Sequence, residues 1–300
     1  MQPRGLWLPP NWVLKAAAGA VLSRRVFGIS DRQWFLGAVI LYGISALHAI
    51  FLWRQQFRQH NRTTYLLLLG GFVLHTVAML LRGFNVSQCP IHNLYEATTF
   101  VVWTSLAVYL VVGLWGRVRF LGAFASPMLF VIGVFALMPS LDKHHGAEPD
   151  FSVAWSSVHA ALVLLSYGTF GLAAVAGGMY LTQLHNLKFN KLRAVLSLLP
   201  PVQRLEGVMG WLLVAGFVLL TAGLGASHEL KRPEGVNYLS DSKVLWSVFV
   251  WLLYLGLLVW RWGFNQRGRR LACGAIGAFA FVVLTFWGTN LLSTLHNPAP

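Results

Sequence analysis

Residues 155–188 read WSSVHAALVLLSYGTFGLAAVAGGMYLTQLHNLK, and the stretch from Ser156 to Gln183 carries no formal charge. Because an α-helix rises 1.5 Å per residue, about 20 apolar residues are enough to cross the hydrocarbon core of a bilayer. This stretch therefore predicts a membrane-spanning helix. Within it, Thr169, Ala173 and Gly177 recur every four residues, and such a stripe of small side chains lets a second helix approach closely.

The composition of the whole chain indicates a membrane protein. Of the 300 residues, 56% are hydrophobic and 11% are charged, whereas soluble domains carry about 25% charged residues. The net charge of +14 could indicate nucleic-acid binding, but Lys and Arg fall in short loops between apolar runs. This pattern predicts contact with membrane lipid and no nucleic-acid partner. The only two cysteines, Cys89 and Cys273, lack the CxxC spacing of metal and redox motifs.

Eight apolar runs in all predict an all-α, polytopic integral membrane protein with about eight transmembrane helices. The preceding residues 1–33 are broken by prolines and arginines and predict an amphipathic arm at the membrane interface. Arg24-Arg25 also resembles a twin-arginine signal, but no small-residue cleavage site follows it. The apolar runs cover residues 34–53, 64–81, 98–116, 120–139, 156–183, 208–226, 244–260 and 271–292.

The loops between these runs predict the orientation of the chain. Basic residues concentrate in the odd-numbered loops and acidic residues in the even-numbered ones. Because cytoplasmic loops carry the excess of Lys and Arg, the odd loops are predicted inside, and the even loops and both termini outside. The basic arm before Trp34 favours the opposite placement, but the seven loops agree with one another. The odd loops hold Arg54, Arg58, Arg62, Arg117, Arg119, Lys188, Lys191, Arg193, Arg204, Arg261, Arg267, Arg269 and Arg270.

This orientation brings two histidines to the outer side of the membrane. His159 lies at the outer end of the fifth span, and His296 follows the eighth. Two neutral imidazoles are common axial ligands of haem iron, so the pair is a candidate haem site. Zinc is the competing metal, but it needs three or four protein ligands, and no HxxH or HxxxH spacing supplies them. His48 and His75 lie inside spans, where an ionisable side chain serves either function or packing.

Several motifs resemble, in order, those of the cytochrome c assembly family, the CcsA/HemX-type membrane proteins. Residues 90–96, PIHNLYE, resemble the family's Pro-x-x-Asn-x-Tyr-Glu segment. The ordered matches cover about residues 64–296, so residues 34–296 are interpreted as one transmembrane domain of this type. The other matches are His75-Thr76 with Arg82-Gly83, Trp155-x-x-x-His159 with Ser166-Tyr167, Leu199-Pro200-Pro201 with Arg204-Leu205-Glu206, and Phe286-x-Gly288-x-Asn290-Leu291-Leu292 with Leu295-His296.

The resemblance implies a protein that handles haem b and presents it on the outer face of the bacterial cytoplasmic (inner) membrane for attachment to apocytochrome c. It implies two further partners, a second membrane subunit of the assembly system and the apocytochrome. By position, His159 and His296 match the two outer histidines that flank the family's tryptophan-rich loop. His75 is a possible ligand for haem in transit. Because no nucleophile–base pair stands out, an assembly factor is predicted rather than an enzyme.

The family's tryptophan-rich motif is largely missing. Its pattern, Trp-Gly-x-x-Trp-x-Trp-Asp-Pro-Lys, corresponds here to residues 237–243, where only Asp241 and Lys243 are retained. Tyr238 is a smaller substitute for the flat tryptophan faces that pack on a porphyrin. The family's haem presenters also carry a histidine in the next span, where this chain has Val259. These departures leave open an alternative, a HemX-type regulatory or scaffold protein without its own haem.

Glu96 has two compatible predicted roles. It can pair with Arg82 or accept a hydrogen bond from an imidazole, which makes it a candidate residue of the haem site. It can also lie in the first turn of the third span with Asn93 as the cap, as in a capping box.

Overall fold

The computed structural model describes residues 29–55, 61–86, 93–114, 119–142, 153–189, 201–229, 241–264 and 268–292. Within these ranges the chain forms eight long helices and three short 3₁₀ helices, and no strand. The elements are α2 (Asp31–Gln55), α3 (Asn61–Val86), α4 (Leu94–Gly113), η1 (Arg119–Leu121), α5 (Gly122–Ala136), η2 (Pro139–Leu141), α6 (Val153–Phe189), α8 (Val202–Ala226), η3 (Ser227–Glu229), α9 (Ser242–Trp262) and α10 (Arg269–Leu292).

Seven of the described helices are long and apolar enough to cross a membrane, and the all-α polytopic class is confirmed. The predicted span at residues 120–139 is built differently from the others. Its helix α5 has 15 residues, which is fewer than the roughly 20 that cross a bilayer. The short helices η1 and η2 flank it, so this segment is three helical pieces rather than one long helix. Of the predicted arm at residues 1–33, residues 1–28 lie outside the described part of the chain.

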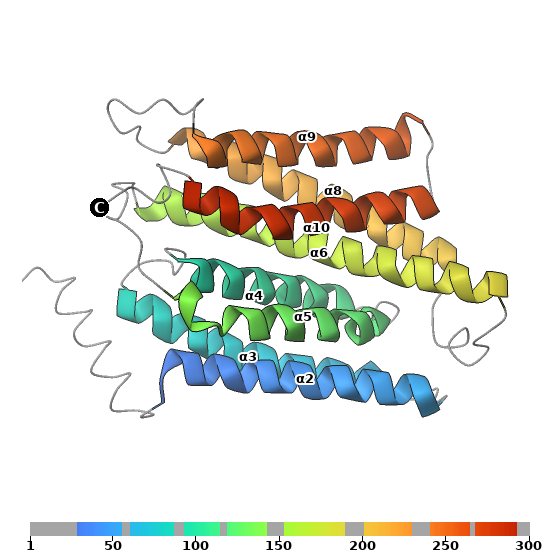
Figure 1. The fold of residues 1–300 in the computed structure, drawn as a ribbon, viewed down its shortest axis with the longest axis horizontal. Coiled ribbons are helices and arrows are strands. Elements are labelled where there is room, and N and C mark those ends of the chain that lie inside the picture. The colour runs from blue at the N-terminus through green and yellow to red at the C-terminus, as the bar shows by residue number, and fades with distance from the viewer. Residues whose placement is uncertain are drawn as a thin grey trace, which may run out of the picture.

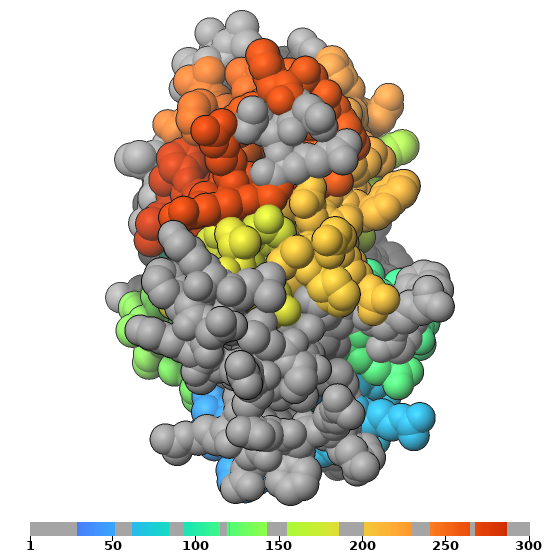
Figure 2. Space-filling view, turned by 90° about the vertical axis from the view of Figure 1, so that its right-hand side faces the viewer, coloured from blue at the N-terminus to red at the C-terminus, as the bar shows by residue number. Residues whose placement is uncertain are grey.

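Successive helices run in opposite directions, so their termini gather at two ends of the bundle (Figure 1). One end holds the starts of α2, α4, α6 and α9 and the last turns of α3, α5, α8 and α10. We call it the His159 end, and the opposite one the His185 end. The predicted placement of odd loops on one side of the membrane and even loops on the other requires the same alternation of helix direction. Figure 2 looks onto the His185 end, where α6, α8, α9 and α10 lie side by side.

The bundle has two halves, one made of α2 to α5 and the other of α6, α8, α9 and α10 (Figure 1). The halves meet chiefly where α4 packs on α6. A Cβ atom on Gly168 of α6 would lie 2.6 Å from both the backbone N of Ser105 and the Oγ1 of Thr104 in α4. Because glycine has no side chain, the two backbones approach closely there. Thr104 also donates a hydrogen bond of 3.1 Å to the carbonyl of Leu164.

Helix α6 has 37 residues and lies at the centre of the second half. Its predicted stripe of small residues is buried, and at Gly177 it meets α10. A Cβ atom on Gly177 would lie 3.1 Å from the carbonyl oxygen of Ala272. The close helix approach predicted from this stripe is therefore present, and α10 is the partner helix.

Candidate functional site

His159 is half-buried in the second turn of α6, and its imidazole is held by α8. Its Nδ1 lies 2.7 Å from the carbonyl oxygen of Gly223. Because a carbonyl only accepts hydrogen bonds, Nδ1 carries the proton and Nε2 keeps its lone pair. Metal-bound histidines are commonly oriented by such a hydrogen bond from the second ring nitrogen. The imidazole of His159 thus has both the tautomer and the anchoring that an iron ligand needs.

The contact depends on a close crossing of α6 and α8. A Cβ atom on Gly223 would lie 2.8 Å from Cγ2 of Val163 and 3.1 Å from its backbone N. Gly223 therefore lets α8 lie directly on α6, which brings its carbonyl within reach of His159. Gly225, two residues further along α8, has nothing within 4 Å of where its Cβ would be.

Three buried aromatic side chains pack together deeper in the same half of the bundle. We call Tyr167, Trp246 and Phe286 the aromatic triad. Its ring centroids are 6.0 Å apart for Tyr167–Trp246 and Tyr167–Phe286, and 6.1 Å apart for Trp246–Phe286. The indole N–H of Trp246 donates a hydrogen bond of 2.7 Å to Thr285. Tyr167 lies eight residues after His159, about 12 Å along the helix, so the triad lies deeper in the bundle than the histidine.

The start of α9 contributes Asp241 and Lys243 to the His159 end. Asp241 is buried, and its Oδ1 accepts hydrogen bonds of 2.9 Å from the N–H of Lys243 and 3.2 Å from that of Val244. Asp241 is therefore the N-cap of α9. The Nζ of Lys243 lies 5.6 Å from the ring centroid of Phe286. Both residues retained from the tryptophan-rich motif therefore lie at the His159 end of the bundle.

The other two predicted residues of this region, Tyr238 and His296, lie outside the described residues. The described part of α10 ends at Leu292, four residues before His296, and it ends at the His159 end (Figure 1). The pairing of His159 with His296 stays a prediction.

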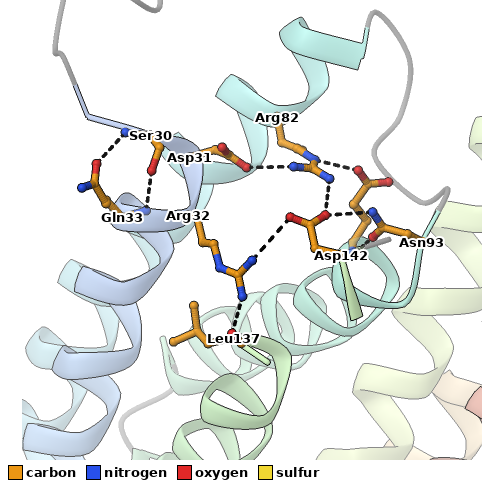
Figure 3. Close-up of polar contacts among 9 residues, drawn as sticks. Ser30, Asp31, Arg32, Gln33, Arg82, Asn93, Leu137 and Asp142 are labelled. Atoms are coloured by element: carbon orange, nitrogen blue, oxygen red, sulfur yellow. Dashed lines mark hydrogen bonds and ion pairs between the residues drawn. The ribbon is translucent and has the colours of Figure 1, made fainter. Parts of the chain in front are cut away.

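A second polar cluster lies at the His159 end of the other half, and Arg82 is at its centre (Figure 3). The guanidinium of Arg82 donates hydrogen bonds of 2.7 Å to Glu96, 2.5 Å to Asp142 and 3.4 Å to Asp31. Glu96 is only 1% exposed. Because a buried carboxylate is costly without a partner, Arg82 makes the burial of Glu96 possible. The cluster ties α3 to α2, α4 and η2, and we call it the Arg82 cluster.

Asp142 also contacts two residues that join the Arg82 cluster through it. Arg32 of α2 lies 3.6 Å from its carboxylate and also donates a hydrogen bond to the carbonyl of Leu137 (Figure 3). The side-chain amide of Asn93 donates a hydrogen bond of 2.9 Å to Asp142. The end of α5 is thereby fixed to the starts of α2 and α4.

Two of the predicted contacts of Glu96, with Arg82 and with Asn93, are present in this cluster. The Oδ1 of Asn93 accepts a hydrogen bond of 2.9 Å from the N–H of Glu96, which confirms Asn93 as the cap of α4. The pairing of Glu96 with Arg82 is confirmed as well. The ring of Tyr95 packs beside the guanidiniums of Arg82 and Arg32, at 5.5 Å and 5.6 Å. These contacts place Glu96 in the half of the bundle that does not contain His159.

His75 is enclosed in the first half of the bundle. Its side chain is 0% exposed, its Nδ1 lies 3.0 Å from the hydroxyl of Tyr42, and its ring centroid lies 4.7 Å from that of Phe35. Its Nε2 is buried and has no hydrogen-bond partner among the described residues. Such an unsatisfied group costs roughly 1–3 kcal/mol. The other histidine inside a span, His48, has its Nδ1 3.3 Å from the hydroxyl of Thr64.

Sequence reasoning missed two features of the His159 end. In the family's motif the tryptophans precede the position of Asp241, whereas Trp246 lies five residues after Asp241, inside α9. It also gave no partner for Nδ1 of His159. The small residue Gly223 in a predicted span was a possible signal for a helix crossing, but the sequence does not say which helix crosses there.

Comparison with known proteins gives a consistent set of relatives. The family model for "Cytochrome C assembly protein" matches residues 91–296. The cytochrome c biogenesis protein CcsA of Trieres chinensis is 25% identical over 310 residues, which cover 92% of this chain and 95% of the relative. Protein HemX of Brevibacillus brevis is 26% identical over 272 residues, 90% of this chain and 99% of the relative. Protein HemX of Bacillus subtilis is 26% identical over 263 residues, which cover 87% of this chain and 95% of the relative.

Proposed function

Because this chain belongs to the cytochrome c assembly protein family, we propose that it is a haem-handling membrane protein of cytochrome c biogenesis. In this proposal, His159 and His296 are the two axial ligands of haem iron, and the haem is presented on the outer face for attachment to apocytochrome c. The observation that carries the proposal is the hydrogen bond from Nδ1 of His159 to Gly223. When bound, haem and the thiols of the substrate supply the chemistry of thioether formation.

The residues around His159 suit a haem ligand. The carbonyl of Gly223 holds the imidazole so that Nε2 is the ligating nitrogen. Asp241 caps α9, and the buried aromatic triad packs the bundle deeper in the same half. Tyr238 is proposed to pack on the porphyrin from the loop before Asp241.

Glu96 and His75 take more distant roles in this proposal. Glu96 contributes through the Arg82 cluster, where it fixes the start of α4. His75 is proposed as a ligand during passage of haem, because its Nε2 has no partner among the described residues. Phe35 and Tyr42 enclose His75, so α2 and α3 would have to separate before iron could reach it.

The sidedness and partners follow from the same proposal. The His159 end is assigned to the outer face of the bacterial cytoplasmic membrane, because the loops at the His185 end carry most of the basic residues. Both chain termini then lie outside. The proposed partners are a second membrane subunit of the assembly system and an apocytochrome c with reduced thiols.

A second function is supported by the missing tryptophans. A chain with this fold and without its own haem would serve as a regulatory or scaffold protein of the membrane. The chain carries Tyr238 where the family's motif has tryptophan and Val259 where haem presenters have histidine, and both differences favour this alternative. A relative named HemX matches 90% of this chain, close to the 92% that a relative named CcsA matches.

An absorption spectrum of the detergent-purified protein separates the two functions. If His159 and His296 bind iron, the protein shows a Soret band at close to one haem per chain, and His159→Ala and His296→Ala each lose most of it. His228→Ala is the matched control, since His228 is an exposed histidine at the same end of the bundle. A folded protein that stays colourless after haem is supplied would support the regulatory alternative. Equal haem content in all three variants would disprove the ligand assignment.

A further inference from the structure

We propose that the guanidinium of Arg119 binds the phosphate of an anionic phospholipid at the His185 end of the bundle, on the side that the proposed orientation assigns to the cytoplasmic leaflet. The site lies in the half made of α2 to α5, and it does not depend on haem. Arg119 belongs to η1, directly before α5, and the residues that hold its side chain come from α3 and α4.

Arg119 is held in place by three contacts. Its Nε donates a hydrogen bond of 2.9 Å to the carbonyl of Gly113, and its guanidinium carbon lies 5.1 Å from the ring centroid of Tyr65. Its own backbone carbonyl accepts a hydrogen bond of 3.0 Å from the hydroxyl of Tyr109. Because a long side chain loses rotamer freedom when a ligand fixes it, a guanidinium that is already fixed loses less on binding.

The neighbours of Arg119 are themselves fixed. The hydroxyl of Tyr65 donates a hydrogen bond of 3.0 Å to the carbonyl of Leu110 in α4. A Cβ atom on Gly113 would lie 2.8 Å from Cε2 of Tyr65, so the glycine lets this ring lie against the end of α4. The position of the guanidinium is therefore set by the packing of α3 on α4.

The remaining donors of Arg119 are suited to a phosphate. Nη1 and Nη2 have no hydrogen-bond or ion-pair partner in the part of the chain that the structure describes. Within the described ranges of α2 to α5, every Asp and Glu lies at the His159 end, so no carboxylate there competes for them. The flat edge formed by Nη1 and Nη2 matches the spacing of two phosphate oxygens.

Helix capping and loop charge explain only part of this arrangement. A basic side chain after a helix can bind its last carbonyls, and the hydrogen bond from Nε to Gly113 does so. The positive charge of a cytoplasmic loop requires no fixed side chain, and Arg62, Arg204 and Arg269 at the same end are exposed. Neither role uses the edge of the guanidinium that carries Nη1 and Nη2.

The surroundings of Arg119 favour a lipid over a soluble anion. Gly113 is the last residue of one candidate membrane span and Tyr65 lies in the first turn of another, so Arg119 lies at the level where spans end. Beside Gly113, the side chains of Val111 and Leu114 are 56% and 67% exposed. Acyl chains can cover such apolar surface while the headgroup meets the arginine, and anionic lipids attract basic residues at this membrane surface.

The test measures lipid binding to the purified full chain by native mass spectrometry. Phosphatidylglycerol and phosphatidylcholine with the same acyl chains are titrated separately. The wild-type chain is expected to bind the anionic lipid about 5- to 10-fold more tightly. Arg119→Gln is expected to lose most of this preference, and Arg119→Lys to keep only part of it, because an ammonium lacks the flat edge. Arg269→Gln makes the same charge change at an exposed residue of the same end and is expected to keep the preference.

Each other outcome would overturn the inference. A wild-type chain without a preference, or an equal loss in Arg119→Gln and Arg269→Gln, would show that no specific site exists. Equal weakening of both lipids in Arg119→Gln would make its role structural. Should Arg119→Gln fail to fold, Arg119→Lys decides, and a full preference there would mean that charge alone is sufficient. An excess of inorganic phosphate is expected to leave lipid binding unchanged, whereas complete displacement of the lipid would indicate a site for a soluble anion.

Discussion

Nδ1 of His159 in α6 donates a hydrogen bond of 2.7 Å to the carbonyl oxygen of Gly223 in α8. The orientation of the candidate iron ligand is therefore set by the distance between two helices. That distance depends in turn on the missing side chain of Gly223, since a Cβ there would lie 2.8 Å from Val163. Ligand geometry and helix packing are coupled at this one crossing.

Gly223→Ala is expected to weaken haem binding without touching the ligand. The added methyl group forces α8 away from Val163 and moves the carbonyl that holds His159, at a packing cost of about 1–3 kcal/mol. Haem content per chain and the melting temperature in detergent are the measurements. Gly225→Ala is the matched control in the same helix, because nothing lies within 4 Å of its Cβ position. A Gly223→Ala protein that binds haem as well as Gly225→Ala would show that the crossing does not set the ligand geometry.

Arg82→Met is expected to lower the free energy of unfolding by about 3–5 kcal/mol, as removal of one partner from a buried ion pair usually does. The substitution leaves the buried carboxylate of Glu96 without its guanidinium and also releases Asp31 and Asp142. Thermal or denaturant unfolding in detergent measures the loss. Arg62→Met is the control in the same helix, because Arg62 is exposed at the opposite end. Equal stability of the two variants would mean that the Arg82 cluster contributes little to folding.

Gly168→Ala tests the packing of α6 on α4, where the two halves of the bundle meet. A Cβ atom there would lie 2.6 Å from the backbone N of Ser105, which belongs to α4 and cannot rotate away. The variant is expected to lose about 1–3 kcal/mol of stability. Gly178→Ala in the same helix has open space around its Cβ and is expected to be neutral or to gain up to about 1 kcal/mol from helix propensity. Unfolding curves of the two variants compare them directly, and superimposable curves would contradict the tight crossing.

The sequence predicted those features that depend on neighbours along the chain. The helices follow from apolar runs, and the cap of α4 and the pairing of Glu96 with Arg82 follow from residues 3 and 14 positions apart. It did not predict that Asp142 joins the same cluster, because Asp142 lies 60 positions after Arg82. Long-range partners of this kind depend on which helices pack together, and a single sequence of similar apolar runs does not specify that.

The same limit applied to the candidate site. His159 could be singled out as an imidazole at the end of an apolar helix, but the Gly223 carbonyl 64 positions away could not. Trp246 was overlooked because a tryptophan inside an apolar run is indistinguishable from ordinary core until its neighbours Tyr167 and Phe286 are known. The shorter helix α5 was also missed, since the apolar run of residues 120–139 extends from η1 to the first residue of η2.

The orientation of the bundle can be tested with reporter fusions that are active only outside the cytoplasm. A fusion after Glu148, in the fourth loop, is expected to be active, and a fusion after Arg193, in the fifth loop, to be silent. The physical reason is the concentration of Lys and Arg in the odd-numbered loops, which holds those loops on the cytoplasmic side. The two positions flank α6, so they must report opposite sides if this helix crosses the membrane. The reverse pattern would turn the His159 end toward the cytoplasm, and His159 would then meet haem at its entry rather than present it to an apocytochrome outside.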